Sequence, residues 1–286
     1  MKIIRANDLK VFNEKKNKND LLKCENFLIN YIRRQAIMLK IDCKDIKYIK
    51  IVSMEQAKDF GGKVEMQEKQ KFNMILSEGI FAYVLQGNEH GENVVRHELY
   101  HIKDGLRVGE KIDIFELYNH RKLKNTKELI LDIGWHQMSE FYAHYYTFED
   151  DISQDRIDKA LSLADIYLTA ISQEVQKKEQ VFLNQNIFKM IENFVDLNVI
   201  ISARDCFRQG YFDKVYESYQ KKYYNLCQYA CDVKEYMQDK FKNYPSEVSE
   251  QFYFEIGLFL MKIFEKYNAK LGQKDFLDPM CVYRLI

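Results

Sequence analysis

The sequence is poor in the residues that interrupt helices. Its 286 residues include only two prolines, Pro245 and Pro279, and the eleven glycines are spread along the chain. Helices therefore meet few breakers, and no Gly- or Pro-rich stretch marks a long flexible linker. We expect a mostly helical protein whose length suits one large domain or two ordinary ones.

An excess of charge of one sign and long apolar runs are also missing. The 43 basic residues balance the 43 acidic ones, so the chain offers no cationic field to attract nucleic acids or anionic membranes. No run approaches the roughly 20 apolar residues of a membrane-spanning helix, and the opening Met1–Arg5 lacks the apolar stretch of a signal peptide. These absences predict a cytoplasmic globular protein with neither nucleic-acid nor membrane partners.

The six cysteines are scattered rather than grouped as a disulfide framework, and we expect them to be reduced. Cys227 and Cys231 lie four residues apart on an expected helix, a spacing that could serve a metal. No second Cys/His pair lies near them in the sequence. We therefore interpret both as core residues.

Apolar periodicity predicts a mixed first part of the chain. After a solvated loop over 14–18, we expect a helix over 20–41 and a strand over 46–52. The segments 72–77 and 80–85 are typical of paired strands joined by a tight turn at Glu78-Gly79. They predict a small sheet.

The second part shows helical periodicity without a strand pattern. We expect amphipathic helices over about 154–178, 187–208, 213–241 and 246–271, the last opening at Pro245-Ser246. The predicted fold class is α+β, with a small sheet and helices over 1–150, followed by a helical bundle over 151–286.

All six histidines fall within one third of the chain, which points to a single site (His90, His97, His101, His120, His136 and His144). His97 and His101 frame the pattern His-Glu-x-x-His. On a helix this spacing places both imidazoles on one face, one turn apart, where they can bind one tetrahedral Zn²⁺. Glu98 lies about 100° round the helix, beside the ion, and can take a proton from the zinc-bound water.

The surrounding residues decide whether this pattern is a site. Val95, Leu99 and Ile102 form one apolar stripe, while His97 and His101 lie opposite with Asp104. Asn88 or Asn93 could cap the start of the helix, and Gly105 is placed as its stop. The alternative is an ordinary solvated face on which Asp104 is one more surface charge.

A catalytic zinc needs a third protein ligand, and Glu140 is the best candidate. On a helix over 127–147 it lies in a stripe whose upstream members are apolar, and a carboxylate placed inward needs a compensating cation. The competing ligands are Asp104, His120 and His136, followed by Glu110, Asp113 and Glu116.

His136 and His144 lie one turn either side of Glu140. They can contact the ligand or stabilise an oxyanion, and each is equally well interpreted as a polar residue at a helix boundary. Tyr142 and Tyr145 are further oxyanion candidates. His144 is the one that we assign a catalytic role.

The succession of a strand-like segment over 81–85, a short polar turn, the His97–His101 motif and a downstream Glu140-x-x-Ala143 resembles the small gluzincin metallopeptidases, most closely the ImmA/IrrE type. The resemblance covers roughly residues 46–148. It implies His97, His101 and Glu140 as zinc ligands and Glu98 as general base.

The predicted function is therefore zinc-dependent hydrolysis of a protein or peptide substrate. Residues 72–77 are a candidate sheet edge for an extended peptide. Hydrolysis of a non-peptide amide would use the same ligands. The alternative is a catalytically silent zinc protein with a regulatory role, which works through its helical C-terminal part.

Overall fold

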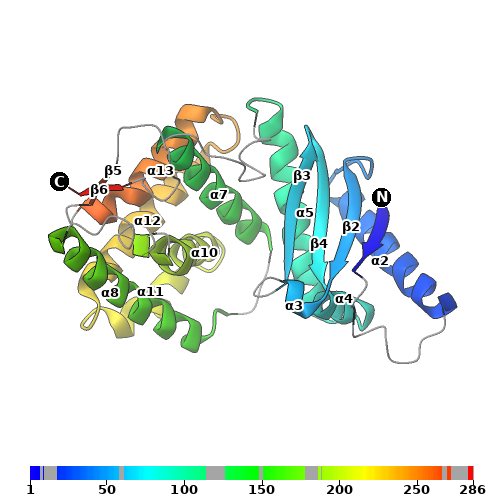
Figure 1. The fold of residues 1–286 in the computed structure, drawn as a ribbon, viewed down its shortest axis with the longest axis horizontal. Coiled ribbons are helices and arrows are strands. Elements are labelled where there is room, and N and C mark those ends of the chain that lie inside the picture. Colours follow the sequence, from blue (N-terminus) through cyan, green and yellow to red (C-terminus); the bar gives the residue numbers. More distant parts are fainter. Residues whose placement is uncertain are drawn as a thin grey trace. The chain divides into compact units, whose positions relative to one another are not determined.

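The computed structural model folds into two compact units (Figure 1). The first comprises Met1–Asn119 and Tyr146–Glu149, and the second comprises His120–Tyr145 and Asp150–Ile286. The structure describes residues 1–6, 9, 18–57, 61–113, 126–147, 151–177, 186–187, 189–265, 269–271 and 283–285. The predicted loop over 14–18 lies outside these ranges, apart from residue 18, which begins a helix.

A four-stranded sheet with strand order β1-β2-β4-β3 forms the centre of the first unit. Its strands are β1 (Lys2–Arg5), β2 (Ile46–Val52), β3 (Gly62–Glu68) and β4 (Lys71–Ser77). β1 and β4 run parallel to β2, and β3 pairs antiparallel with β4. The predicted strands over 46–52 and 72–77 are confirmed, whereas β1 and β3 were not predicted. Since β4 lies between β2 and β3, the predicted sheet edge at 72–77 is wrong, and the edge strands are β1 and β3.

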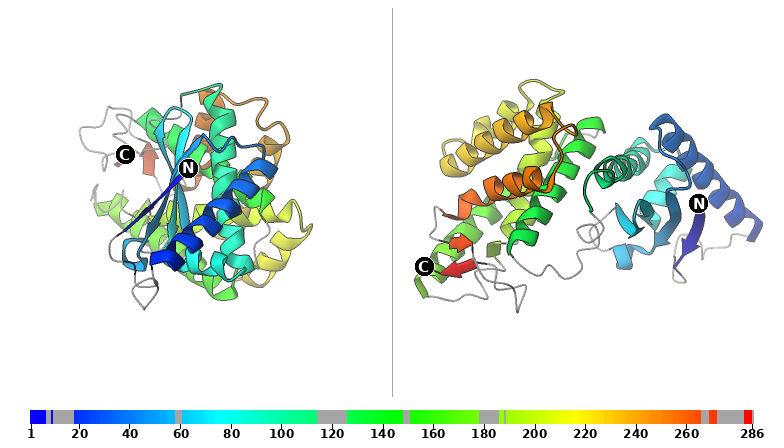
Figure 2. Two further views of the ribbon diagram at one scale, coloured as in Figure 1. Left: turned by 90° about the vertical axis from the view of Figure 1, so that its right-hand side faces the viewer. Right: turned by 90° about the horizontal axis from the view of Figure 1, so that it is seen from above.

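Helices cover one face of this sheet (Figure 2). They are α2 (Lys18–Met38), α4 (Glu78–Leu85) and α5 (Glu89–Gly109), while the short α3 (Met54–Ala57) follows β2. The predicted helix over 20–41 is thus confirmed as α2. The core lies between sheet and helices, and its sheet side consists of fully buried apolar residues (Ile49, Ile51, Phe72, Met74 and Leu76). On the other face, Ala57 of α3 covers Val52 and Ile75.

The predicted strand over 80–85 is wrong because the segment is helix α4. This segment had also contributed to the resemblance to the gluzincin metallopeptidases. Ser77 is extended, and its hydroxyl accepts a hydrogen bond from the Ile80 backbone N–H (3.3 Å), which makes Ser77 an N-cap. Ile80, Phe81 and Val84 are buried at helical spacing. Short apolar runs do not distinguish a strand from a buried helix, and here the cap decides.

Helix α5 begins as predicted and ends later. Asn88 accepts a hydrogen bond from the His90 N–H at 3.0 Å, so the cap at Asn88 is confirmed. The predicted stop at Gly105 is wrong, because the helix continues to Gly109 and buries Val108. The apolar stripe that includes Val95 is fully buried, as predicted.

The second unit is helical, which confirms the mainly helical C-terminal part. Its helices are α7 (Thr126–Tyr146), α8 (Gln154–Lys177), the π-helix η1 (Ile191–Val195), α10 (Asp196–Asp205), α11 (Tyr211–Tyr216), the 3₁₀ turn η2 (Glu217–Tyr219), α12 (Tyr224–Lys242) and α13 (Glu250–Glu265). A small antiparallel hairpin of β5 (Ala269–Leu271) and β6 (Tyr283–Leu285) follows. The predicted division at residue 150 groups α7 with the first part, whereas its contacts place it, up to Tyr145, in the second unit.

Two predicted C-terminal helices differ from the structure. The helix over 213–241 is interrupted, because η2 and the buried Tyr219 and Tyr223 separate α11 from α12. The helix over 246–271 begins only at Glu250, where Ser249 accepts a hydrogen bond from the Phe252 N–H at 3.1 Å. Cys227 is buried in α12, which confirms the prediction that it is a core residue. Burial raises the pKa of its thiol to about 11.

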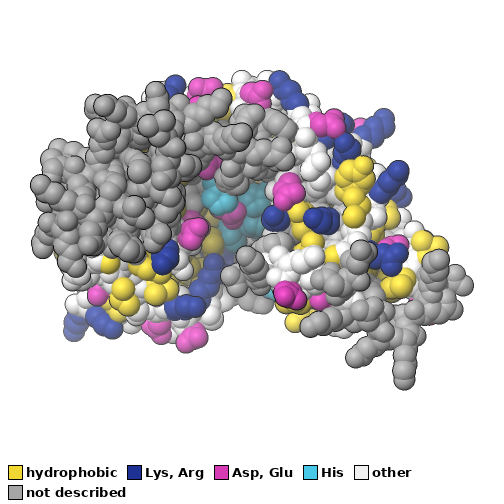
Figure 3. Space-filling model, viewed as in Figure 1, with side chains coloured by type: hydrophobic (Ala, Val, Ile, Leu, Met, Phe, Trp, Pro, Cys, Tyr) yellow, Lys and Arg dark blue, Asp and Glu magenta, His cyan; other side chains and the backbone are white. Residues whose placement is uncertain are grey.

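No single-sign patch stands out on the described part of the face in Figure 3. Lys, Arg, Asp and Glu side chains are interspersed over the described part of the face in Figure 3, in line with the balanced composition. Among the described helices, none is both long and apolar enough to cross a membrane.

Two glycines let the backbones of α7 and α13 approach closely. An ideal Cβ on Gly134 would lie 1.8 Å from the Tyr253 carbonyl oxygen, and one on Gly257 would lie 2.0 Å from the Ile130 carbonyl oxygen. Backbone atoms cannot rotate away as a flexible side chain can. Both glycines are therefore required for this packing, which fixes α7 in the second unit.

We predict that Gly134→Ala lowers the free energy of unfolding by about 3 kcal/mol or more, since overpacking against a backbone forces the helices apart. Urea unfolding of the full chain measures this. Gly109→Ala is the matched control, because a Cβ at this position would lie an ordinary 3.7 Å from Gln70 Cγ. Equal stability of the two variants would contradict the close approach.

Candidate metal centre

His97 and His101 face each other on α5. Their Nε2 atoms lie 3.0 Å apart, and their rings meet edge to face. Two nitrogens that bind one tetrahedral zinc at ~2.0–2.1 Å lie ~3.3 Å apart. The pair is therefore spaced for one shared ion, and the same distance also suits a hydrogen bond between the two rings.

This face of α5 is not a solvated one. The side chain of His101 is 8% exposed and that of Asp104 is fully buried. The alternative that treats Asp104 as a surface charge is therefore wrong.

The segment after α7 contacts α5 within the first unit. Thr147 Oγ1 lies 3.5 Å from Nδ1 of His97, the ring nitrogen that faces away from His101. Tyr146 stacks on Tyr100 with ring centroids 5.1 Å apart. Burial raises the pKa of Tyr100, with a further contribution from Tyr146, which keeps the Tyr100 hydroxyl protonated. Neither contact was predicted.

Glu98, the predicted base, is 5% exposed and its side chain lies against the edge strand β3. Its Cγ and Oε1 come within 2.8 and 2.9 Å of the position that a Cβ would occupy on Gly62. Glu98 thus leaves the helix in a different direction from the two imidazoles, as its place in the sequence predicts.

Glu140 and His144 are neighbours on α7. His144 Nε2 lies 3.6 Å from Glu140 Oε2, one helical turn away. His144 is buried and Glu140 is partly buried. This places His144 beside the predicted ligand, where a protonated imidazole would stabilise the carboxylate.

The other oxyanion candidates lie elsewhere in the second unit's packing. Tyr142 is buried beside Tyr244, with ring centroids 5.8 Å apart, and Tyr145 packs on Phe207 and Phe241. Both tyrosines therefore contribute to an aromatic cluster. His136 is partly buried on α7.

A second carboxyl group lies near Glu140 within the second unit. Asp196, at the junction of the π-helix with α10, accepts a hydrogen bond from the side-chain amide of Gln137. Burial raises the pKa of Asp196 well above its usual range; the Gln137 hydrogen bond opposes this rise, and the charge of Glu140 adds to it. The sequence did not single out Asp196.

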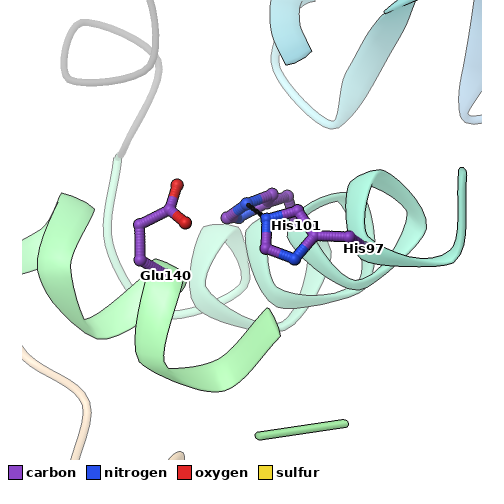
Figure 4. Close-up of side chains that lie close together, drawn as sticks. All are labelled: His97, His101 and Glu140. Carbon is purple, nitrogen blue, oxygen red and sulfur yellow. Dashed lines mark hydrogen bonds between the residues drawn. The ribbon is translucent and has the colours of Figure 1, made fainter. Parts of the chain in front are cut away.

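Three of the predicted residues form a candidate ligand group. One ligand atom each from His97, His101 and Glu140 lies within 4.8 Å of the others. Figure 4 shows these three side chains, the two imidazoles on one helix, α5, and the Glu140 carboxylate on another, α7. Of the competing ligands, Asp104, His136, Glu110 and Asp113 join no such group among the described residues, and His120 and Glu116 lie outside these residues.

No protein-family model matches the chain. No curated protein and no solved structure matches it either. The resemblance to the gluzincins stays a prediction that rests on two short motifs, His97–His101 and Glu140-x-x-Ala143.

Asp196 provides a test of the electrostatics around Glu140. An acid whose folded-state pKa lies above its unfolded value binds its proton more tightly when folded, so stability falls as the pH rises between the two values. Asp196→Asn keeps an oxygen for the Gln137 hydrogen bond and cannot ionise. We predict that the metal-free variant melts above the wild type near pH 8, and that the difference shrinks towards about pH 5.

Thermal unfolding at several pH values measures this difference. Asp165→Asn, at an exposed position on α8, is the control and should leave the pH dependence of Tm unchanged. If Asp196→Asn melts at the wild-type temperature at both ends of the pH range, Asp196 is not a buried acid with a raised pKa.

Proposed function

We propose that this chain is a zinc-dependent hydrolase that cleaves a protein or peptide substrate. The observation that carries the proposal is on α5. Two imidazole nitrogens lie 3.0 Å apart, and a buried carboxylate, Glu98, follows the first histidine and leaves the helix on another side. A purely structural zinc site has no use for an adjacent base.

The donor set suits zinc. Two neutral imidazoles and one carboxylate are the ligands of many catalytic zinc ions, and three protein ligands leave a fourth position open.

Chain connectivity also supports Glu140 as the third ligand. Tyr146 and Thr147 contact Tyr100 and His97 within the first unit. Glu140 precedes Thr147 by seven residues along α7, a rise of about 10 Å. The chain between Thr147 and Glu140 is therefore short enough for the carboxylate to reach the two imidazoles.

When bound, the ion would lower the pKa of a water ligand towards ~7 and polarise the substrate carbonyl. Glu98 accepts the proton of the attacking water and passes it to the leaving nitrogen. Burial of Glu98 against β3 limits the positions that its carboxylate can take. His144 holds Glu140, and its earlier assignment to the oxyanion stays a prediction.

The edge strand β3 supports a peptide as the substrate. β3 ends the sheet on the side of α5, which it contacts. An extended peptide can add to such an edge through backbone hydrogen bonds. This favours a peptide over a compact amide, and it transfers the predicted peptide-binding role from residues 72–77 to β3.

We predict that the purified protein binds about one zinc per chain. His97→Ala and His101→Ala should each weaken zinc binding by at least ~100-fold, because each removes a direct ligand. Zinc content by mass spectrometry after equilibration with a chelator measures this. His90→Ala, on the same helix, is the matched control and should retain the metal. Unchanged zinc in the His97/His101 double variant would rule out the site.

Glu98→Gln separates binding from chemistry, since it removes a base and no ligand. Zinc content should stay at the wild-type level, while cleavage of an unstructured peptide mixture should slow by ~10²–10⁴-fold. The control is Glu89→Gln, at an exposed position in the first turn of α5. A wild-type cleavage rate in Glu98→Gln would remove Glu98 from the mechanism, and full zinc binding without any cleavage by the wild type would favour the silent zinc protein.

A further inference from the structure

The side chain of Glu98 occupies space that only a glycine on β3 leaves open. A Cβ on Gly62 would lie 2.8 Å from Glu98 Cγ, 2.9 Å from Oε1 and 3.1 Å from Cδ. Non-bonded carbon atoms prefer separations of about 3.5–4.0 Å. All three contacts are with the carboxylate arm of one residue.

From this contact we propose that Gly62 is a positioning residue for Glu98: the missing side chain at the start of the edge strand sets where the carboxylate of the base lies. The role in catalysis rests on the proposed function, whereas the contact does not. Gly62 itself touches no reacting atom.

Neither the backbone of β3 nor that of α5 can move away from a Cβ added at Gly62 at low cost in free energy. Gly62 pairs with Leu76 of β4, and the carbonyl of the preceding Gly61 accepts a hydrogen bond from the Ser77 N–H at 2.9 Å. On the other side, Val95 and Leu99 fix α5 in the core with fully buried side chains. The displacement therefore falls on the side chain of Glu98.

A displaced base should affect turnover more than metal binding. His97 and His101 leave α5 in another direction, and their spacing does not depend on Gly62. A misplacement of about 1 Å in a catalytic group can cost ~10²-fold in rate. Gly62→Ala should thus lower kcat by about 100-fold, with a small change in KM and with zinc content unchanged.

Gly61 offers a matched control on the same strand end. A Cβ there would lie 3.2 Å from Ile80 Cγ1, 3.4 Å from Ile80 Cδ1 and 3.6 Å from Val94 Cγ1, all in apolar side chains, and no atom of Glu98 would be nearer than these. Gly61→Ala introduces the same methyl group one residue away and should leave kcat close to the wild-type value.

The contact between Gly62 and Glu98 can be tested by thermal unfolding, without an activity assay. In the zinc-free full chain, Gly62→Ala should lower Tm by on the order of 5 °C, and most of this loss should vanish in a Glu98→Ala background, where the arm is gone. Gly61→Ala should show no such coupling to Glu98→Ala. If Gly62→Ala alone does not fold, recovery of a folded double variant gives the same support. Equal losses in both backgrounds would overturn the proposal.

Kinetics on the zinc-loaded chain then tests the role. Gly62→Ala should slow the wild type about 100-fold and should add nothing further in a Glu98→Gln background. Coupled stabilities with an undiminished kcat in Gly62→Ala would overturn the positioning role and leave the hydrolase intact. Coupled stabilities in a wild-type protein that cleaves no peptide would overturn the proposed function and the catalytic role of Gly62 with it.

Discussion

Helix α5 buries an apolar stripe on one side and presents two imidazoles on another. The candidate centre depends on this division of the helix surface. Val95, Leu99 and Ile102 bury one side of the helix in the core of the first unit. The four-residue step from His97 to His101 then brings two imidazoles together on another side. Any rotation of α5 about its axis would expose the apolar stripe, so the same core packing that stabilises the fold also orients the histidines.

Two carboxyl groups, one in each unit, are removed from water. Glu98 is buried against β3, and Asp196 lies in the second unit where the charge of Glu140 helps to raise its pKa. Buried carboxylates are costly unless hydrogen bonds or cations compensate them. A divalent ion on Glu140 would oppose the rise in the pKa of Asp196. Metal binding and the protonation of Asp196 should therefore be coupled.

Local sequence patterns predicted the motif and the long helices better than the small elements. The spacing of His97, Glu98 and His101 and the stripe on α5 are contained in one helix, so periodicity alone reveals them. Segment 80–85 was misassigned, because the Ser77 cap and burial against α5 outweigh its strand-like composition. The edge strand β3 has a weak apolar pattern. Its pairing with β4 is seen only in the folded structure and cannot be read from the local sequence. For the same reason the contact of Gly62 with Glu98 could not be predicted.

In the proposed function, two imidazoles and one carboxylate bind a single zinc ion that keeps an open position. X-ray absorption at the zinc edge of the loaded full chain tests it most directly. The account predicts a shell of about four N/O ligands at ~2.0–2.1 Å that includes two imidazoles, and the loss of one imidazole in His101→Ala. Sulfur ligands, or a shell of water oxygens without imidazole scattering, would contradict it.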